Sequence, residues 1–210
     1  MHPELERLAQ QYPDIQACLP EVQAAYDILW LTFSNGGRLL TCGNGGSAAD
    51  SDHIVGELMK GFERQRPIHD ELRQHLLAFA DERGIYLADR LQRALPAISL
   101  SSHAALATAI SNDVAADMVF AQQVLGYGRA GDVLLAISTS GNADNILNAL
   151  YVARALGLRT IGMTGQTGGK MRAVCDVAIC VPHQRTLQIQ ERHLPIYHAL
   201  CIMLEEAFFA

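Results

Sequence analysis

Lysine is scarce in this sequence, occurring only at Lys60 and Lys170, and the arginines are scattered without forming a basic run. The formal net charge of the 210 residues is −6. A general nucleic-acid-binding protein normally carries a basic patch, so we expect no direct nucleic-acid partner. An acidic chain can still bind a small anion when backbone amides and hydroxyl groups hold it.

Signals of an oxidised or membrane-bound protein are also missing. The cysteines are odd in number and form no C-x-x-C motif: Cys18, Cys42, Cys175, Cys180 and Cys201. Four of them lie in apolar stretches, where cysteine acts as a small hydrophobe, so we expect reduced thiols. The N-terminus has no apolar leader region, and no apolar run approaches the roughly 20 residues that cross a bilayer. These absences predict a cytoplasmic protein without a membrane partner.

The composition that is present suits one large domain, or one domain carrying an insertion. Half of the residues are hydrophobic, which is enough to form a buried core. Charged residues make up 18%, below the usual quarter. That low share is typical of a chain that hides surface between subunits, and equally of a compact monomer. We find no internal repeat and no low-complexity tract.

Hydrophobic periodicity predicts alternating helices and strands. Two helices are expected at about 3–18 and 20–35, broken at Leu19-Pro20. Strands are expected at 38–42, 97–100, 132–137, 159–163 and 177–181. Further helices are expected at about 48–59, 103–111, 114–125, 143–156 and 186–207. Five strands separated by helices predict an α/β fold with a parallel sheet covered on both faces. The charged segment at about 68–94 predicts two amphipathic helical pieces separated by Gly84.

Two loops rich in glycine and hydroxyl residues each lie between a predicted strand and a predicted helix. The first contains Asn44, Gly45, Gly46 and Ser47, and the second contains Ser138, Thr139 and Ser140. Either loop alone could be an ordinary strand–helix turn or N-cap cluster. Neither is a Walker loop or a dinucleotide fingerprint. Because both follow strands of one open sheet, they are expected to meet at its carboxyl edge and to bind a phosphorylated ligand.

The helix after the first loop carries His53 and Glu57, four residues apart and therefore on one face. A surface hydrogen-bonded pair is the simpler interpretation. However, the apolar residues Ile54, Val55 and Leu58 indicate a helix that is packed on much of its circumference. In that setting a histidine–carboxylate pair can bind a divalent metal or transfer protons.

For five other polar residues, the sequence pattern alone does not distinguish a site residue from an ordinary surface or capping residue. Gln190, His193 and His198 fall within about 140° of arc on the last predicted helix, which could equally be its water-facing side. Periodicity does not choose between the two histidines. Asn112 and Asp113 end a predicted helix, where such a pair is usually a cap or turn.

Four stretches of the sequence together resemble the phosphoheptose isomerases, or sedoheptulose 7-phosphate isomerases, of the sugar isomerase (SIS) superfamily. They are residues 42–57, 110–113, 131–142 and 189–198. The resemblance extends over nearly the whole chain except about 68–94. It implies one SIS domain over residues 1–210: a three-layer sandwich with a five-stranded, flavodoxin-like parallel sheet, N-terminal helices within 1–36 and a helical insertion at about 68–94.

The resemblance also implies a site and an assembly. The family's metal pattern maps to His53, Glu57, Gln190 and His198, and the implied metal is zinc. The sugar-phosphate site would comprise Asn44, Gly45, Gly46, Ser47, Glu57, Asn112, Asp113, Ser138, Thr139, Ser140 and Gln190. Family members are usually homotetramers whose sites are built partly at subunit interfaces, so we expect a homotetramer. The catalytic residues would be Glu57, for the carbon-bound proton, and His198, for proton transfer at oxygen.

The sequence departs from the family pattern in three places. Ala143 stands where a further serine often follows the S-T-S motif, and Leu187 stands where some relatives have aspartate. The segment at about 68–94 is longer than in the typical enzyme. Two alternatives to a heptose isomerase therefore stay open. One is a regulatory relative that binds the replication initiator DnaA, although such relatives lack the glutamate and the final histidine. The other is an isomerase or sensor for a different sugar phosphate.

Overall fold

Five parallel strands form the centre of the computed structural model, which describes residues 2–210. They are β1 (Leu39–Gly43), β2 (Ala97–Ser99), β3 (Val133–Ile137), β4 (Arg159–Thr164) and β5 (Val177–Cys180). Their spatial order is β2-β1-β3-β4-β5, and all neighbours pair in parallel. This is the flavodoxin-like order, with the topological switch point between β1 and β3. The predicted five-stranded parallel sheet is therefore confirmed.

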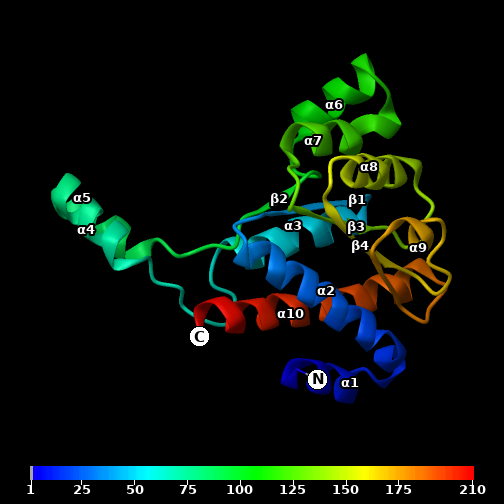
Figure 1. Cartoon of the computed structure of the whole chain (residues 1–210), viewed down its shortest axis with the longest axis horizontal. Helices are drawn as coiled ribbons and strands as arrows, with labels where there is room; N and C mark the ends of the chain where they lie inside the picture. The colour runs from blue at the N-terminus through cyan, green and yellow to red at the C-terminus, as the bar shows by residue number, and fades with distance from the viewer. Residues whose placement is uncertain (1) are drawn as a thin grey trace.

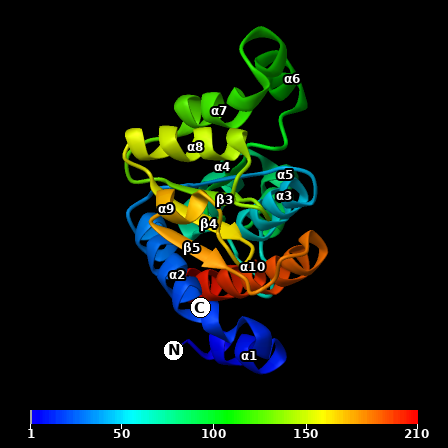
Figure 2. The same ribbon diagram turned by 90° about the vertical axis from the view of Figure 1, so that its right-hand side faces the viewer.

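Helices cover the sheet on both faces, which gives three layers (Figures 1 and 2). One face is covered by α1 (Pro3–Gln11), α2 (Leu19–Ser34), α3 (Gly46–Met59) and α10 (Thr186–Phe209). The other is covered by α7 (Val119–Tyr127), α8 (Asp144–Ala155) and the short α9 (Met171–Val174), and α6 (Ala104–Asp113) lies beyond α7. Two 3-10 turns, Pro13–Cys18 and Ala116–Met118, complete the connections.

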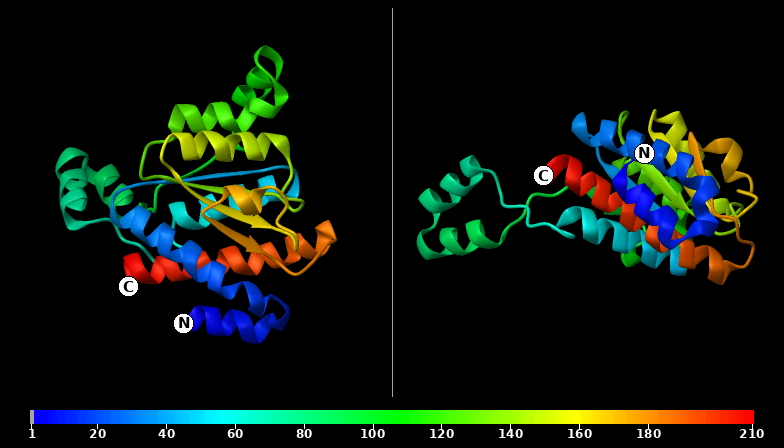
Figure 3. Two further views of the ribbon diagram at one scale, coloured as in Figure 1. Left: turned by 45° about the vertical axis from the view of Figure 1, so that its right-hand side comes forward. Right: turned by 90° about the horizontal axis from the view of Figure 1, so that it is seen from below.

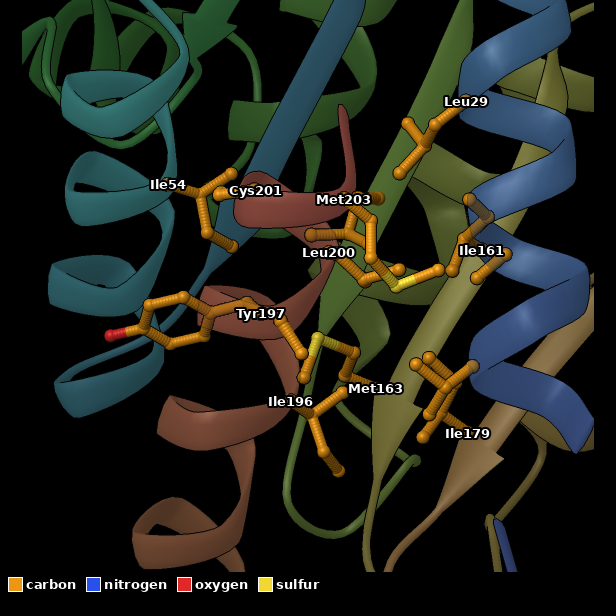
Figure 4. Close-up of a cluster of buried hydrophobic side chains, with 14 of the residues drawn as sticks. Leu29, Ile54, Ile161, Met163, Ile179, Ile196, Tyr197, Leu200, Cys201 and Met203 are labelled. Atoms are coloured by element: carbon orange, nitrogen blue, oxygen red, sulfur yellow. The ribbon is translucent and has the colours of Figure 1, made fainter. Parts of the chain in front are cut away.

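The central strands bury both of their faces because alternate side chains enter two separate cores. In β3, Val133, Leu135 and Ile137 join the core beneath α2 and α10, whereas Leu134 and Ala136 join the core beneath α7 and α8. Figure 4 shows the first of these cores, where apolar side chains of α2, α3 and α10 meet those of β4 and β5. This packing fixes α3 and α10 side by side, and both helices bear predicted site residues.

Several predicted boundaries move for identifiable reasons. The first helix ends at Gln11 and a 3-10 turn begins at Pro13, because proline disfavours the helical conformation in the residue before it. Pro20 lies in the first turn of α2, where its missing N–H is harmless. All five cysteines are free. Within residues 2–210, no helix combines the length and apolarity needed to cross a bilayer.

The predicted helical insertion forms two helices, α4 (Asp70–Phe79) and α5 (Asp81–Arg90), which stand away from the sheet as a hairpin (Figure 3, right). An antiparallel bridge between Pro67 and Gln92 closes its stem. The expected break at Gly84 is wrong, because the chain turns at Ala80 and Gly84 lies inside α5. A Cβ at Gly84 would collide with the Leu76 carbonyl oxygen, so this glycine allows α5 to approach α4. The assignment of residues 1–210 to one domain stays a prediction.

Candidate active site

The two glycine- and hydroxyl-rich loops lie beside each other at the carboxyl edge of the sheet, on either side of the switch point. They enclose a pocket of about 390 Å³, together with the start of α10. Its lining residues are Asn44, Gly45, Gly46, Ser47, Ile137, Ser138, Thr139, Ser140, Ala143, Thr186 and Gln190. Eight of the residues predicted for the sugar-phosphate site thus share one pocket.

The first loop turns sharply from β1 into α3. Gly45 occupies the N-cap with φ 55°, a conformation that favours glycine. The helix begins at Gly46, so Ser47 lies in its first turn and does not cap it. A Cβ at Gly46 would lie 2.5 Å from Nε2 of Gln190, so this glycine lets α10 approach the loop. The helix N-terminus and the amide of Gln190 consequently face the same pocket.

The second loop keeps its hydroxyl groups out of the helix cap. The helix α8 has Ala143 at its N-cap, without a side-chain capping bond, so the interpretation as an ordinary N-cap cluster is wrong here. Because position 143 is alanine, the second loop contributes three hydroxyl residues to the pocket, Ser138, Thr139 and Ser140.

A pair of reciprocal hydrogen bonds joins the two loop regions across the switch point. The amide of Asn44 donates to Asn145 over 3.0 Å, and the amide of Asn145 donates to Asn44 over 2.9 Å. Sequence reasoning missed Asn145, because nothing in the local pattern of α8 indicates its partner 101 residues away.

A cluster of ionisable side chains lies between α3 and α10. Nε2 of His53 is 3.2 Å from Oε1 of Glu57, and Nζ of Lys60 is 3.0 Å from Oε2 of the same carboxylate. The rings of His53 and His198 meet edge to face, with their centroids 5.0 Å apart. His53 therefore links Glu57 and His198, which are 141 residues apart in the sequence.

The hydroxyl of Tyr197 orients the ring of His53. It lies 2.9 Å from Nδ1 of His53 and donates to Oδ1 of Asp50 over 3.3 Å. Figure 4 shows Tyr197 reaching from α10 toward α3. Sequence reasoning missed this contact, because a tyrosine beside apolar residues in a helix signals only core packing.

The two histidines of α10 lie in different environments. His193 is fully buried, with Nε2 3.4 Å from the Thr164 carbonyl oxygen, and burial lowers its pKa to about 4. His198 faces His53 and Phe62, and burial together with the His53 ring lowers its pKa. Of the two, only His198 stands next to the pair formed by His53 and Glu57.

The chemistry of these side chains suits zinc, which binds imidazole nitrogens and carboxylate oxygens. Nε2 of His198 is buried and has no hydrogen-bond partner, as a nitrogen reserved for a ligand would be. Across residues 2–210, no group of three or more His, Cys, Asp or Glu side chains is arranged as a metal site. The amide of Gln190 lies at the pocket, whereas His53, Glu57 and His198 do not line it.

Asn112 and Asp113 do not line the pocket of their own chain. They end α6, which lies beyond α7 in Figure 1. Both are exposed, and the Asn112 amide donates to the Asp113 carboxylate over 2.9 Å.

Comparison with known proteins places the chain in a family. A family model described as the SIS domain matches residues 15–93 and 79–165. The phosphoheptose isomerase of Rhodospirillum rubrum is 39% identical over 190 residues, which cover 90% of this chain and 87% of that protein. The phosphoheptose isomerase of Pelobacter propionicus is 42% identical over 178 residues, covering 85% of this chain and 80% of that protein.

The fold agrees with that similarity. The solved structure of phosphoheptose isomerase from Neisseria gonorrhoeae superposes with a TM-score of 0.70 at 33% sequence identity. The match covers 96% of this chain and 98% of that one. The resemblance found in the sequence motifs therefore extends to the whole architecture.

Proposed function

Because the chain belongs to the SIS-domain family of phosphoheptose isomerases, we propose that it interconverts sedoheptulose 7-phosphate and D-glycero-D-manno-heptose 7-phosphate. One observation carries the proposal. Glu57 and His198 come from two helices and meet through His53, and both helices begin at a pocket lined by amide and hydroxyl groups. Proton transfer on a phosphorylated sugar needs this combination of groups.

The two loops bind the phosphate. The N-terminus of α3 brings the partial positive charge of the helix dipole to the pocket. Ser138, Thr139 and Ser140 add hydroxyl donors. These neutral donors bind the phosphate without a basic patch, which agrees with the scarcity of lysine.

Glu57 then moves a proton between the two reacting carbons, and His198 moves one between their oxygens. Glu57 removes a proton from C1 of the ketose and returns it to C2, through a cis-enediol. His198 transfers the proton between the oxygens on C1 and C2, so that the hydroxyl at C1 becomes the aldehyde and the ketone at C2 becomes a hydroxyl. The half-buried imidazole of His198 has a lowered pKa, which favours the neutral form that accepts a proton.

Zinc is part of the proposal, with His53, Glu57, Gln190 and His198 as its ligands. When bound, it would polarise the carbonyl group and stabilise negative charge on the enediolate oxygens. A carboxylate bound to the metal is a poorer base, so Glu57 must be free when it accepts the proton. A homotetramer is also part of the proposal, in which the exposed Asn112 and Asp113 would serve the site of a neighbouring subunit.

Glu57→Gln tests the proposal. Turnover of sedoheptulose 7-phosphate, followed by NMR of the aldose product, should fall by about 10²–10⁴-fold. Binding of inorganic phosphate should stay near the wild-type value, because the loops are intact. Glu63→Gln, an exposed position soon after α3, is the matched control and should retain activity. An active Glu57→Gln variant would exclude Glu57 as the base.

The same assay separates the alternatives. Activity on another ketose phosphate, but none on the seven-carbon substrate, would redirect the proposal to a different isomerase. A wild-type chain that binds phosphate and DnaA but isomerises none of the sugars would be a regulatory protein.

A further inference from the structure

A buried ion pair lies directly behind the candidate base. Arg66 is wholly buried, and its Nε donates to Oε1 of Glu205 over 2.8 Å. Glu205, near the end of α10, is 1% exposed. The ring of Phe209 covers the guanidinium, 4.5 Å from its central carbon. The pair is therefore sealed from solvent.

The rest of the Arg66 guanidinium binds the end of α3. Nη1 donates to the carbonyl oxygen of Leu58 over 2.8 Å, and Nη2 donates to that of Glu57 over 3.0 Å. The last carbonyl groups of a helix have no partners within it and favour a cation. Arg66 thus holds the backbone of the residue whose carboxylate is the proposed base.

Glu205 fixes the other side of the same turn. Its two carboxylate oxygens accept backbone N–H groups of Phe62, Glu63 and Arg64 over 2.8, 2.8 and 3.1 Å. Burial raises the pKa of Glu205, but these bonds and Arg66 outweigh it and lower the pKa below the ordinary value. Three successive N–H groups of the turn that joins α3 to Arg66 are consequently tied to α10.

A gain in stability does not by itself explain the presence of a buried ion pair. Desolvation largely cancels the attraction between two buried charges, and apolar residues of similar size often stabilise a fold as well or better. An apolar pair, however, could not bond two carbonyl oxygens and three N–H groups at once. What this arrangement adds is a fixed position for the last turn of α3.

We propose that Arg66, held by Glu205, is a positioning residue that fixes Glu57 relative to His198 during isomerisation. This inference rests on the proposed function. Both elements that carry the reacting groups, α3 and α10, are joined through this pair, and the phosphate loops are not. Disturbing the pair should therefore impair proton transfer and leave phosphate binding intact.

The test is a comparison of kcat and KM in Arg66→Lys and Glu205→Gln, assayed well below the unfolding temperature of each. Lysine keeps the charge but cannot bond three acceptors in one plane. We expect kcat to fall at least about tenfold, with KM for sedoheptulose 7-phosphate and the Kd of inorganic phosphate within about twofold of wild type. Arg73→Lys, in the exposed pair of Arg73 with Asp89, is the matched control and should change neither.

A purely structural pair would give the opposite result: lower unfolding temperatures with an unchanged kcat per folded molecule. That outcome would overturn the inference. If Arg66→Lys does not fold, Glu205→Gln decides alone, because it keeps the side-chain size and one acceptor oxygen. Hydrogen exchange at residues 57–60 gives a readout independent of activity and should accelerate in the variants. A wild type without isomerase activity would refute the proposed function, whereas unchanged exchange and kcat would refute only the positioning role.

Discussion

The folded protein should lose stability in mild acid because of buried His193, and replacing this residue should abolish that loss. The side chain is fully buried in α10, and burial lowers its pKa from 6.5 to about 4. The hydrogen bond to the Thr164 carbonyl oxygen opposes that shift only in part. Below pH 6.5 the unfolded chain therefore binds a proton that the folded chain does not bind until about pH 4, so stability must fall as the pH is lowered.

The magnitude follows from the two pKa values. Each pKa unit corresponds to about 1.4 kcal/mol, so the full difference is about 3 kcal/mol, reached below pH 4. At pH 5 the loss is already about 2 kcal/mol, whereas at pH 7 it is close to zero. A neutral glutamine at this position would not contribute such a loss.

The assay is urea unfolding of wild type and His193→Gln at pH 7 and pH 5. We expect the variant to be the less stable at pH 7, because its packing is disturbed, and the difference to shrink by about 2 kcal/mol at pH 5. His75→Gln, at an exposed position of α4, should respond to pH as the wild type does. If the free energies of wild type and His193→Gln stay parallel from pH 7 to pH 5, the reasoning from burial is refuted.

Two further predictions concern the first loop and the hairpin. Gly46→Ala should displace the Gln190 amide and lower kcat/KM up to about tenfold, the worth of one hydrogen bond, in the isomerase assay. Gly56→Ala, on the same helix with open space around it, is the control, and equal activity of both would contradict the contact. Replacing residues 69–91 by a short glycine–serine turn should change Tm by only a few degrees in circular dichroism, because every residue of α4 is at least partly exposed and the stem is already closed. Loss of the folded state would show that the hairpin belongs to the core.

The sheet was predictable because each strand is a short apolar run between turn residues. Strands separated by helices are expected to be parallel with right-handed crossovers, but the order of the strands was implied only by the resemblance to the SIS superfamily. Local boundaries were less accurate where tertiary contact decides them. Gly84 is an example. It allows the backbone of α4 to pack closely against α5, and this contact has no signal in the local sequence.

The residues of the candidate site also differ in how far the sequence predicted them. The loop residues after β1 and β3 were predictable for two reasons. Parallel strands place their carboxyl ends at one edge of the sheet, and the glycine and hydroxyl residues of each loop are visible in the local sequence. Periodicity could not choose between His193 and His198, because both lie on the same arc of α10, and only the family resemblance selected His198. Asp113 differs from these residues, since only the family resemblance assigned it to the site and the chain alone does not bring it to the pocket.

The least predictable feature is the contact between Arg66 and Glu205. In the sequence, Arg66 is one of several charged residues before the insertion, and Glu205 is one of two acidic residues near the end of the last helix. Charged residues at such places are usually solvated, so pattern alone assigns them to the surface. Only the packing of α10 against α3 buries them. A buried charge no longer interacts with water, so it must be paired and hydrogen-bonded within the protein. Here those partners are the backbone groups on both sides of the turn after Glu57, and for that reason the pair bears on the reaction.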